Sequence, residues 1–433
     1  MTMRCRGLAT FCLVTIALAM WPPDGLAQLV PPGEGLTVDE LVVYAIANNP
    51  DLAAARADVE AAMGRLRQAG LRPNPTLELT GQQNVAGPDN NVTVGVTLPL
   101  DLNGRKEGRV AVAEHELELK RAQVGERERR LRADVRRKAG DRLAAARNLE
   151  FTEALLAVNR NALGLVGKRV REGAAPALEE SLILVEVNRL DAARQMLESR
   201  VAIAELEVKA LAGLGPDVPL QVRAEFDMPV TVARDRALER ALGARPDLRT
   251  ADAEVAMARA RIGRERAEGR WDASISVGYQ RQETGFNLNG LTDRGGTRPI
   301  QDTFNMVGGG VSITLPVRNR NQSNIQAARS ETQAAEHRRE IQVLIVRQEV
   351  AAAFTQHAAA RRALEIYARG VRDVARQNLD VVRGSYGLGR IALLEVIAEQ
   401  RRFIEVETGY TEALKQAYDA AVEIERVIGV AVR

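Results

Sequence analysis

The side chains best suited to catalysis or metal binding are scattered along this sequence. His115, His337 and His357 have no second ligand three or four residues further on except ordinary Glu or Gln. A metal site needs several converging ligands, so we interpret the three as solvated histidines on helix faces and expect no bound metal. We also find no credible Ser/His/Asp or Cys/His set and no phosphate loop. The sequence therefore argues against an enzyme and predicts no cofactor.

Both cysteines, Cys5 and Cys12, lie in an N-terminal segment with the features of a secretory signal. A positively charged start precedes an apolar run from Leu8 to Met20, and small residues up to Ala27 favour cleavage before Gln28. We predict residues 1–27 as a signal peptide, with an uncleaved anchor as the alternative. The mature chain then contains no cysteine, which excludes disulfides and thiol chemistry.

The composition is typical of long helices packed side by side. Aromatic residues make up only 3% of the chain, whereas Ala, Arg, Glu and Leu are abundant. The formal net charge is +3, from 60 basic and 57 acidic residues, and no dense basic run is interleaved with aromatics. The sequence therefore predicts no nucleic-acid partner. Beyond Gln28 no apolar stretch approaches the length of a membrane-spanning helix.

The chain contains an internal duplication. Asn49-Pro50-Asp51-Leu52 corresponds to Arg245-Pro246-Asp247-Leu248, and Val96-Thr97-Leu98-Pro99 corresponds to Ile313-Thr314-Leu315-Pro316. The first pair is offset by about 196 positions and later landmarks by about 216. An insertion between Tyr279 and Met306 accounts for the difference. We predict two repeats, residues 28–215 and 216–433.

Each repeat shows the same order of elements. In the first, the pattern predicts a short helix over Leu36–Ala47 with Thr37 as its N-cap, and a second helix over Asp51–Gly70. A β-hairpin follows, and then a helical period lasts for about 70 residues, far beyond ordinary helix lengths. Glycine clusters near Gly173 and Gly389 end the long helices, and a second helix returns.

The predicted hairpins alternate apolar and polar residues. We expect strands over 76–80, 92–98, 273–279 and 307–315, and the segment Gln280–Asn305, rich in Gly, Asn, Thr and Asp, as a surface loop. Such strands suit a barrel with lipid outside and water inside. The residues expected to face lipid are Leu77, Leu79, Val92, Val94, Val96, Ile275, Val277, Val311 and Ile313. Those expected to face the lumen are Glu78, Thr80, Thr93, Thr97, Ser274, Ser276, Ser312 and Thr314.

Lengths make the architecture specific. The long helix over Gly104–Arg171 spans roughly 100 Å, and the helices over Pro50–Leu71 and up to Gly213 together span roughly 92 Å. Two shorter helices stacked end to end can therefore lie along one long helix, which is the geometry of a cylinder wall. Four strands cannot close a barrel, because about eight are needed. Open sheet edges are not tolerated in hydrocarbon, so the chain must oligomerise.

Over nearly its whole mature length the chain resembles the TolC-like outer-membrane efflux factors. Leu41-Val42-Val43-Tyr44 through Asp51-Leu52 looks like the opening helix pair of that family, and Tyr386-Gly387-Leu388-Gly389 looks like its helical-tip signature. Val96-Thr97-Leu98-Pro99 through Gly104-Arg105 is similar to the CzcC-like heavy-metal branch. The resemblance implies a mostly α-helical protein with a membrane β part, a homotrimer whose twelve-stranded barrel continues as a periplasmic tunnel.

The resemblance also implies partners and a site. It places the chain in the outer membrane of a Gram-negative bacterium, in contact with outer-membrane lipid, as a passive duct. A periplasmic adaptor docks at the helix tips, and an inner-membrane pump of the resistance-nodulation-division (RND) type supplies energy. By similarity, Tyr386 joins the gate contacts, and Glu395, with its repeat counterpart Glu179, falls where some members carry an acidic ring. The residues proposed for the gate and the adaptor contact are Gly173, Glu179, Tyr386, Gly389, Arg390 and Glu395.

Alternatives remain open from the residues alone. Arg390 lies one position before the family's gate arginine, and the tip charges could be ordinary solvated helix ends. The cargo could be a heavy-metal cation or, second, a lipophilic drug or organic solvent. The strands could instead be soluble hairpins packed on the helices. In that case the chain would be a periplasmic coiled-coil structural or adaptor protein, or a secreted helical binding protein.

Overall fold

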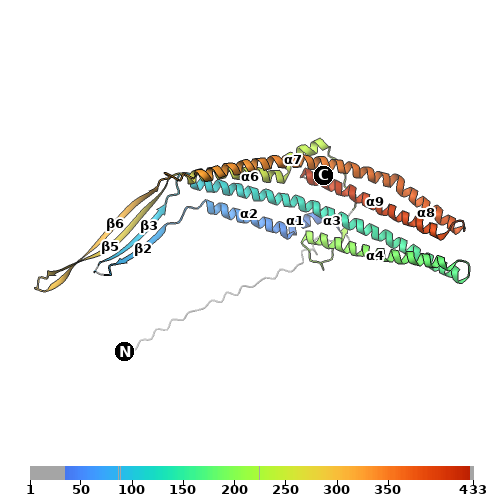
Figure 1. Ribbon diagram of the computed structural model, residues 1–433, viewed down its shortest axis with the longest axis horizontal. Helices are drawn as coiled ribbons and strands as arrows, with labels where there is room; N and C mark the ends of the chain where they lie inside the picture. The colour runs from blue at the N-terminus through green and yellow to red at the C-terminus, as the bar shows by residue number, and fades with distance from the viewer. Residues whose placement is uncertain (1–34, 86, 88, 224, 430–433) are drawn as a thin grey trace, which may run out of the picture.

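The computed structural model describes residues 35–429 apart from 86, 88 and 224. The predicted signal peptide, residues 1–27, lies outside the described residues. The molecule is long and narrow, with the β-strands at one end and the turns between the long helices at the other (Figure 1). Within the described part, no helix has an apolar stretch long enough to cross a membrane.

The helices of the first repeat follow the predicted bounds closely. They are α1 (Val38–Asn48), α2 (Pro50–Ala69), α3 (Arg105–Arg171) and α4 (Ala177–Ala212). Thr37 caps α1 in a capping box with Glu40, and Asn49 caps α2 ahead of a proline in its first turn. These side chains satisfy backbone N–H groups that a helix start leaves unpaired. The predicted N-cap at Thr37 is confirmed, and the helices begin at Val38 and Pro50, within two residues of the predicted starts at Leu36 and Asp51.

The second repeat has the same order with one irregularity. Its helices are α5 (Arg234–Ala244), α6 (Pro246–Glu268), α7 (Gln322–Ile366), α8 (Arg372–Gly387) and α9 (Leu393–Ile428). A π-helical turn, Tyr367–Val371, joins α7 to α8. The predicted long helical run after Pro316 is therefore present, and the π-helical turn interrupts its α-helical geometry. A short parallel pair, β1 (Leu36–Thr37) with β4 (Val222–Arg223), links the two repeats.

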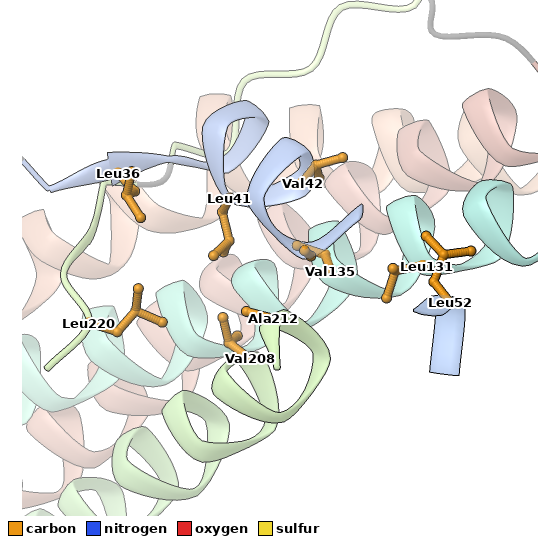
Figure 2. Packing of buried hydrophobic residues seen from close by; sticks show 10 residues of the cluster. Leu36, Leu41, Val42, Leu52, Leu131, Val135, Val208, Ala212 and Leu220 are labelled. Carbon is orange, nitrogen blue, oxygen red and sulfur yellow. The ribbon is translucent and has the colours of Figure 1, made fainter. Parts of the chain in front are cut away.

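Half-length helices lie end to end along the long ones, as the length comparison predicts. Both α2 and α4 pack along α3, and α6 and α9 pack along α7 (Figure 1). With 67 residues, α3 spans about 100 Å. The buried cluster at the α2–α4 junction gathers Leu41 of α1, Val135 of α3, and Val208 and Ala212 of α4 (Figure 2).

The same junction is built twice with different chemistry. In the first repeat, Asn49 Nδ2 donates to the carbonyl of Leu211 at the end of α4, at 2.9 Å. In the second, Arg245 reaches the carbonyl of Val427 at the end of α9, at 3.5 Å, and pairs with Asp247 and Glu349. Arg245 is fully buried, at 1% exposure. A buried guanidinium is tolerated only when it is paired and hydrogen-bonded. The arginine that takes the place of Asn49 in the second repeat is therefore accompanied by the carboxylates of Asp247 and Glu349.

The strands form one four-stranded antiparallel sheet in the order β2-β3-β5-β6. Its strands are β2 (Thr76–Gln83), β3 (Asn90–Pro99), β5 (Asp272–Leu291) and β6 (Thr297–Thr314). β3 pairs with β5, which joins the two hairpins and leaves β2 and β6 as unpaired edges. The sheet extends away from the helices (Figure 1), so the alternative of hairpins packed on the helices is wrong.

The register sorts the predicted residues onto two faces. Leu77 lies opposite Val96, which lies opposite Val277, and Ile275 lies opposite Val311. Because cross-strand partners share a face, all nine residues predicted to face lipid lie on one face, which we call the Val277 face. The eight predicted to face the lumen lie on the other, the Ser276 face. Both faces are solvent-accessible in the single chain: Leu79 on the Val277 face is 70% exposed, and Phe304 on the Ser276 face is 50% exposed.

The segment Gln280–Asn305 differs from its prediction as a surface loop. β5 continues to Leu291 and β6 begins at Thr297, so most of the segment is strand, with a turn closed by Gly295 at φ 77. This hairpin extends past the β2–β3 hairpin (Figure 1). Backbone pairing across the long hairpin satisfies the N–H and C=O groups despite the loop-like composition.

Candidate functional site at the helix tips

Two matching turns form the end of the molecule opposite the sheet (Figure 1). Gly173 follows α3 with φ 71, and Gly389 follows α8 with φ 70. In each turn the residue after the glycine donates its N–H to a carbonyl five residues earlier: Ala174 to Arg169 and Arg390 to Ser385. The left-handed backbone of this helix-end motif strongly favours glycine, which explains both glycines predicted for the tip.

The turns bring Tyr386 and Glu179 together from different repeats. Tyr386 Oη donates to Glu179 Oε2 at 2.8 Å, across 207 residues of sequence. The tyrosine ring is partly buried among apolar residues of α3, α4 and α9, including Val166, Ile183 and Val396. Burial raises the pKa of Tyr386, and the contact with Glu179 raises it further. The phenol therefore stays protonated near neutral pH and ties α8 to the start of α4.

The two acidic residues predicted as repeat counterparts lie in equivalent backbone positions but different surroundings. Glu179 N–H donates to Pro176 O and Glu395 N–H to Ala392 O, so each lies in the first turn of its helix. A carboxylate there is favoured by the helix dipole. Glu179 is half-buried against Tyr386, whereas Glu395 is exposed and forms no ion pair within the described chain. Only Glu395 therefore presents a free carboxylate to solvent.

Arg390 is exposed in the second turn and has no ion-pair partner among the described residues. The second tip thus carries a cation at Arg390, in the connecting turn, and an anion at Glu395, in the first turn of α9. Gly173 and Gly389 are exposed as well.

The sequence reasoning missed a buried ion cluster behind the tip. Glu186 of α4 is fully buried and accepts hydrogen bonds from Arg189 on its own helix and from Arg401 of α9, the latter at 3.0 Å. Burial alone would raise the pKa of Glu186, but the bonds from Arg189 and Arg401 outweigh it and hold the pKa below its usual value. The available signal was a carboxylate on the apolar stripe of Ile183, Val187 and Leu190, with an arginine three residues later.

A second polar contact joins α8 to α9 near the π-helical turn. Arg372 donates to the buried Glu407 at 2.6 Å and lies 4.8 Å from the ring centroid of Tyr410. Arg147 of α3 lies over the same ring at 5.2 Å. Three helices therefore meet on Tyr410. With the Glu186 cluster, these contacts fix the helices that carry the tips.

The histidines remain apart from one another. His115 and His337 each contact a glutamate three residues later on the same helix, and burial together with Arg361 lowers the pKa of His357. Across the described residues, no group of three or more His, Cys, Asp or Glu side chains is arranged to hold a metal ion.

Known proteins resemble this chain over nearly its whole length. Its sequence is 23% identical to the cobalt-zinc-cadmium resistance protein CzcC of Cupriavidus metallidurans over 396 residues, covering 91% of this chain and 90% of that protein. The crystal structure of CusC superposes with a TM-score of 0.73 at 18% identity, covering 91% of this chain and 92% of that one. The outer membrane protein VceC of Vibrio cholerae gives 0.69 at 18% identity, covering 91% and 96%.

The family comparison agrees with the two-part organisation of the chain. The sequence pattern of the family described as outer membrane efflux protein matches residues 41–214 and again residues 237–430. These two stretches contain both hairpins, both long helical runs and both tip turns described above. This chain therefore belongs to the outer membrane efflux protein family.

Proposed function

We propose that three copies of this chain form the passive exit duct of a tripartite efflux system in a Gram-negative outer membrane. The sheets join into a twelve-stranded barrel in lipid, and the helices continue as a tunnel across the periplasm. A periplasmic adaptor docks at the tip turns, and an inner-membrane RND-type pump delivers the cargo. The duct itself performs no chemistry.

The observation that carries the proposal is the sheet with two unpaired edges and two accessible faces. β2 and β6 leave their outer backbone groups unpaired, and in the part of the sheet near the helices apolar residues cover the Val277 face while the Ser276 face is polar. Lipid would accept that face but not the open edges. Pairing β2 of one copy with β6 of the next removes every edge. Two copies would give eight strands, enough to close a small barrel; the family resemblance favours three.

The helical layer supports the same assembly. α4 and α8 are its outermost helices near the tips (Figure 1), and both carry exposed apolar residues. On α4, Leu178, Val185 and Met196 are 60–66% exposed, and on α8, Val374 and Val381 are 55% and 61% exposed. Packing copies side by side would bury these residues against each other.

For the cargo, we infer heavy-metal cations. The similarity to a cobalt-zinc-cadmium resistance protein over nine-tenths of both chains supports this class. The exposed Glu395 supports it physically, because three symmetric carboxylates at a narrow, low-dielectric opening concentrate cations by their field. Hydrated cations would pass without being chelated by histidines.

The cargo is tested by deleting the coding region and measuring growth. Loss of the chain should sensitise the strain to cobalt, zinc, cadmium or copper and leave tolerance to lipophilic drugs unchanged, and plasmid expression should restore growth. The opposite profile would support the second candidate, a drug or organic-solvent duct. Sensitivity to neither class would remove both cargoes.

A further inference from the structure

The polarity of both sheet faces changes partway along the long hairpin. Near the helices, the Val277 face is apolar through Ile275, Val277 and Tyr279, while the Ser276 face carries Ser274, Ser276 and Gly278. Nine residues lead from Trp271, at the start of β5, to Tyr279, about the length of one barrel crossing. Aromatic residues commonly mark both membrane boundaries of such barrels.

Beyond Tyr279 the Val277 face becomes polar. Arg281 pairs with Glu283 at 2.7 Å, and Tyr279 Oη donates to Asn305 Oδ1 at 2.6 Å. The register places these four side chains on one face, since Tyr279 lies opposite Val307 and Arg281 opposite Asn305. A charged pair on the lipid-facing side of the barrel is unfavourable inside the bilayer. The hairpin therefore leaves the lipid at this level.

The Ser276 face gains apolar side chains over the same residues. Met306 and Phe304 lie opposite Gln280 and Gln282, the polar pair Thr284 and Asp302 follows, and then Phe286 lies opposite Ile300. The four apolar side chains are 42–56% exposed. These residues do not contact lipid in a barrel, because they continue the face predicted to line the lumen. A group of apolar side chains on a water-facing surface indicates that another surface covers them.

The surroundings of the hairpin also change at this point. β3 pairs with β5 only as far as Glu283, opposite Asn90, and Asp89 then accepts the N–H of Gly285 at 2.9 Å. Phe286 and Ile300 therefore lie on a ribbon of two strands without further sheet neighbours. Two-stranded ribbons twist strongly and are marginal alone in water. A bulge between Phe286 and Asn289 resets the alternation beyond them.

We propose that the Phe286–Ile300 pairs of the three chains converge on the pore axis and form an apolar collar at the outer mouth. The proposal rests on the trimeric duct, because threefold symmetry makes the three Ser276 faces meet across the lumen. The occupant of each apolar face is thus the same face of the sister hairpins. Hydrophobic constrictions gate pores by excluding water, so the collar restricts entry from outside until outgoing cargo separates the hairpins.

Single cysteines test the convergence directly. Both native cysteines precede residue 28, so the processed chain offers a free background. Ile300→Cys lies on the collar face, and Gln301→Cys is the matched control on the opposite face of the same strand. Disulfide formation needs Cβ atoms within about 4.5 Å. Oxidation should link two of the three chains in Ile300→Cys and leave Gln301→Cys unlinked.

A labelling experiment tests the barrier. Ser276→Cys places a thiol on the luminal face within the barrel, where a charged, membrane-impermeant thiol reagent added outside cells must pass the collar. Adding Phe286→Ser and Ile300→Ser should speed labelling several-fold, whereas Gln301→Ser and Thr303→Ser on the outer face should not change it. The collar is overturned if neither cross-linking nor labelling distinguishes the two faces while the protein is a trimer. If no trimer forms, the duct proposal itself fails.

Discussion

At the scale of single residues, the helix tips combine one engaged carboxylate with one free carboxylate. Glu179 is held by Tyr386, and Glu395 in the equivalent helix position faces solvent. The duplication therefore produced two similar turns that are no longer interchangeable. The tyrosine contact holds α8 against the start of α4, while the carboxylate of Glu395 is accessible to solvent.

Glu395→Ala should lower the cation selectivity of single channels in planar bilayers. The reason is the loss of three negative charges from the narrow opening that the proposed trimer would have at the helix tips. The reversal potential in a salt gradient measures the effect. Glu405→Ala, an exposed residue farther along α9, serves as the control. Unchanged selectivity in Glu395→Ala would remove this residue from the constriction.

Tyr386→Phe should raise the open probability of the same channels. The substitution keeps the ring and removes the hydrogen bond to Glu179, worth about 1–2 kcal/mol for a partly exposed bond to a charged group. Such a difference changes an equilibrium ratio about 5- to 30-fold. Glu179→Gln retains an acceptor oxygen and should have a smaller effect. Equal gating in all three proteins would show that the contact does not hold the tip closed.

Arg401→Met should destabilise the helical tip region. It removes one of the two partners of the buried Glu186 and should cost about 1.5–3 kcal/mol. Arg402→Met, the adjacent residue at 75% side-chain exposure, should change stability by less than about 0.5 kcal/mol. Denaturant unfolding of the detergent-solubilised protein, followed by circular dichroism, measures both. Similar effects of the two substitutions would contradict a role for the Glu186 cluster.

The Glu186 cluster also has a definite pH dependence. Because the folded-state pKa of Glu186 is lowered, its stabilising contribution is fully present above the ordinary value of 4.5 and is lost as the pH falls through the folded-state pKa. The difference between the native chain and Arg401→Met should therefore shrink below about pH 4.5. A difference that grows on acidification would reverse the sign of this argument.

At the scale of elements, the residues that start and end helices made the helices predictable, whereas the polar composition of one hairpin made its strands hard to predict. Thr37, Pro50 and Gly173 set helix ends by local backbone chemistry, so the predicted starts and stops of the first repeat lie within a few residues of those observed. Gln280–Asn305 was mistaken for a loop because its apolar residues switch faces near Tyr279. The π-helical turn at Tyr367–Val371 could not be predicted, because no proline or capping side chain marks it in the sequence.

The tip site was partly predictable for the same reason. Gly173 and Gly389 follow from helix-end geometry, but the pairing of Tyr386 with Glu179 depends on how two helices from different repeats pack. Glu186 was missed because its arginine from α9 is 215 residues away. Spacing within one helix cannot reveal such partners.

Val381→Glu on the outer helix α8 should weaken the trimer. A charge at this exposed apolar position, 61% accessible in the single chain, would be buried without a partner between copies. The temperature at which the detergent-extracted oligomer dissociates on semi-native gels should fall. Asp380→Glu introduces the same side chain one position away and should leave it unchanged. No difference between the two variants would place Val381 outside the subunit contact.

At the scale of the whole molecule, the single chain is an incomplete structure. Its sheet has two unpaired edges, its Val277 face is apolar and accessible near the helices, and its outer helices carry exposed apolar residues. Each of these features is unfavourable in a monomer in water. Side-by-side assembly of several copies, with their sheets in lipid, would remove all three. The consistency of the three features favours a duct over a periplasmic coiled-coil or a secreted binding protein.

The most direct test of this account is the mass of the processed protein after extraction from membranes. Light scattering corrected for bound detergent should give three chains per particle, and the protein should not stay in solution when the detergent is removed. A monodisperse single chain in plain buffer would contradict the account, since such a molecule could not close a pore wall.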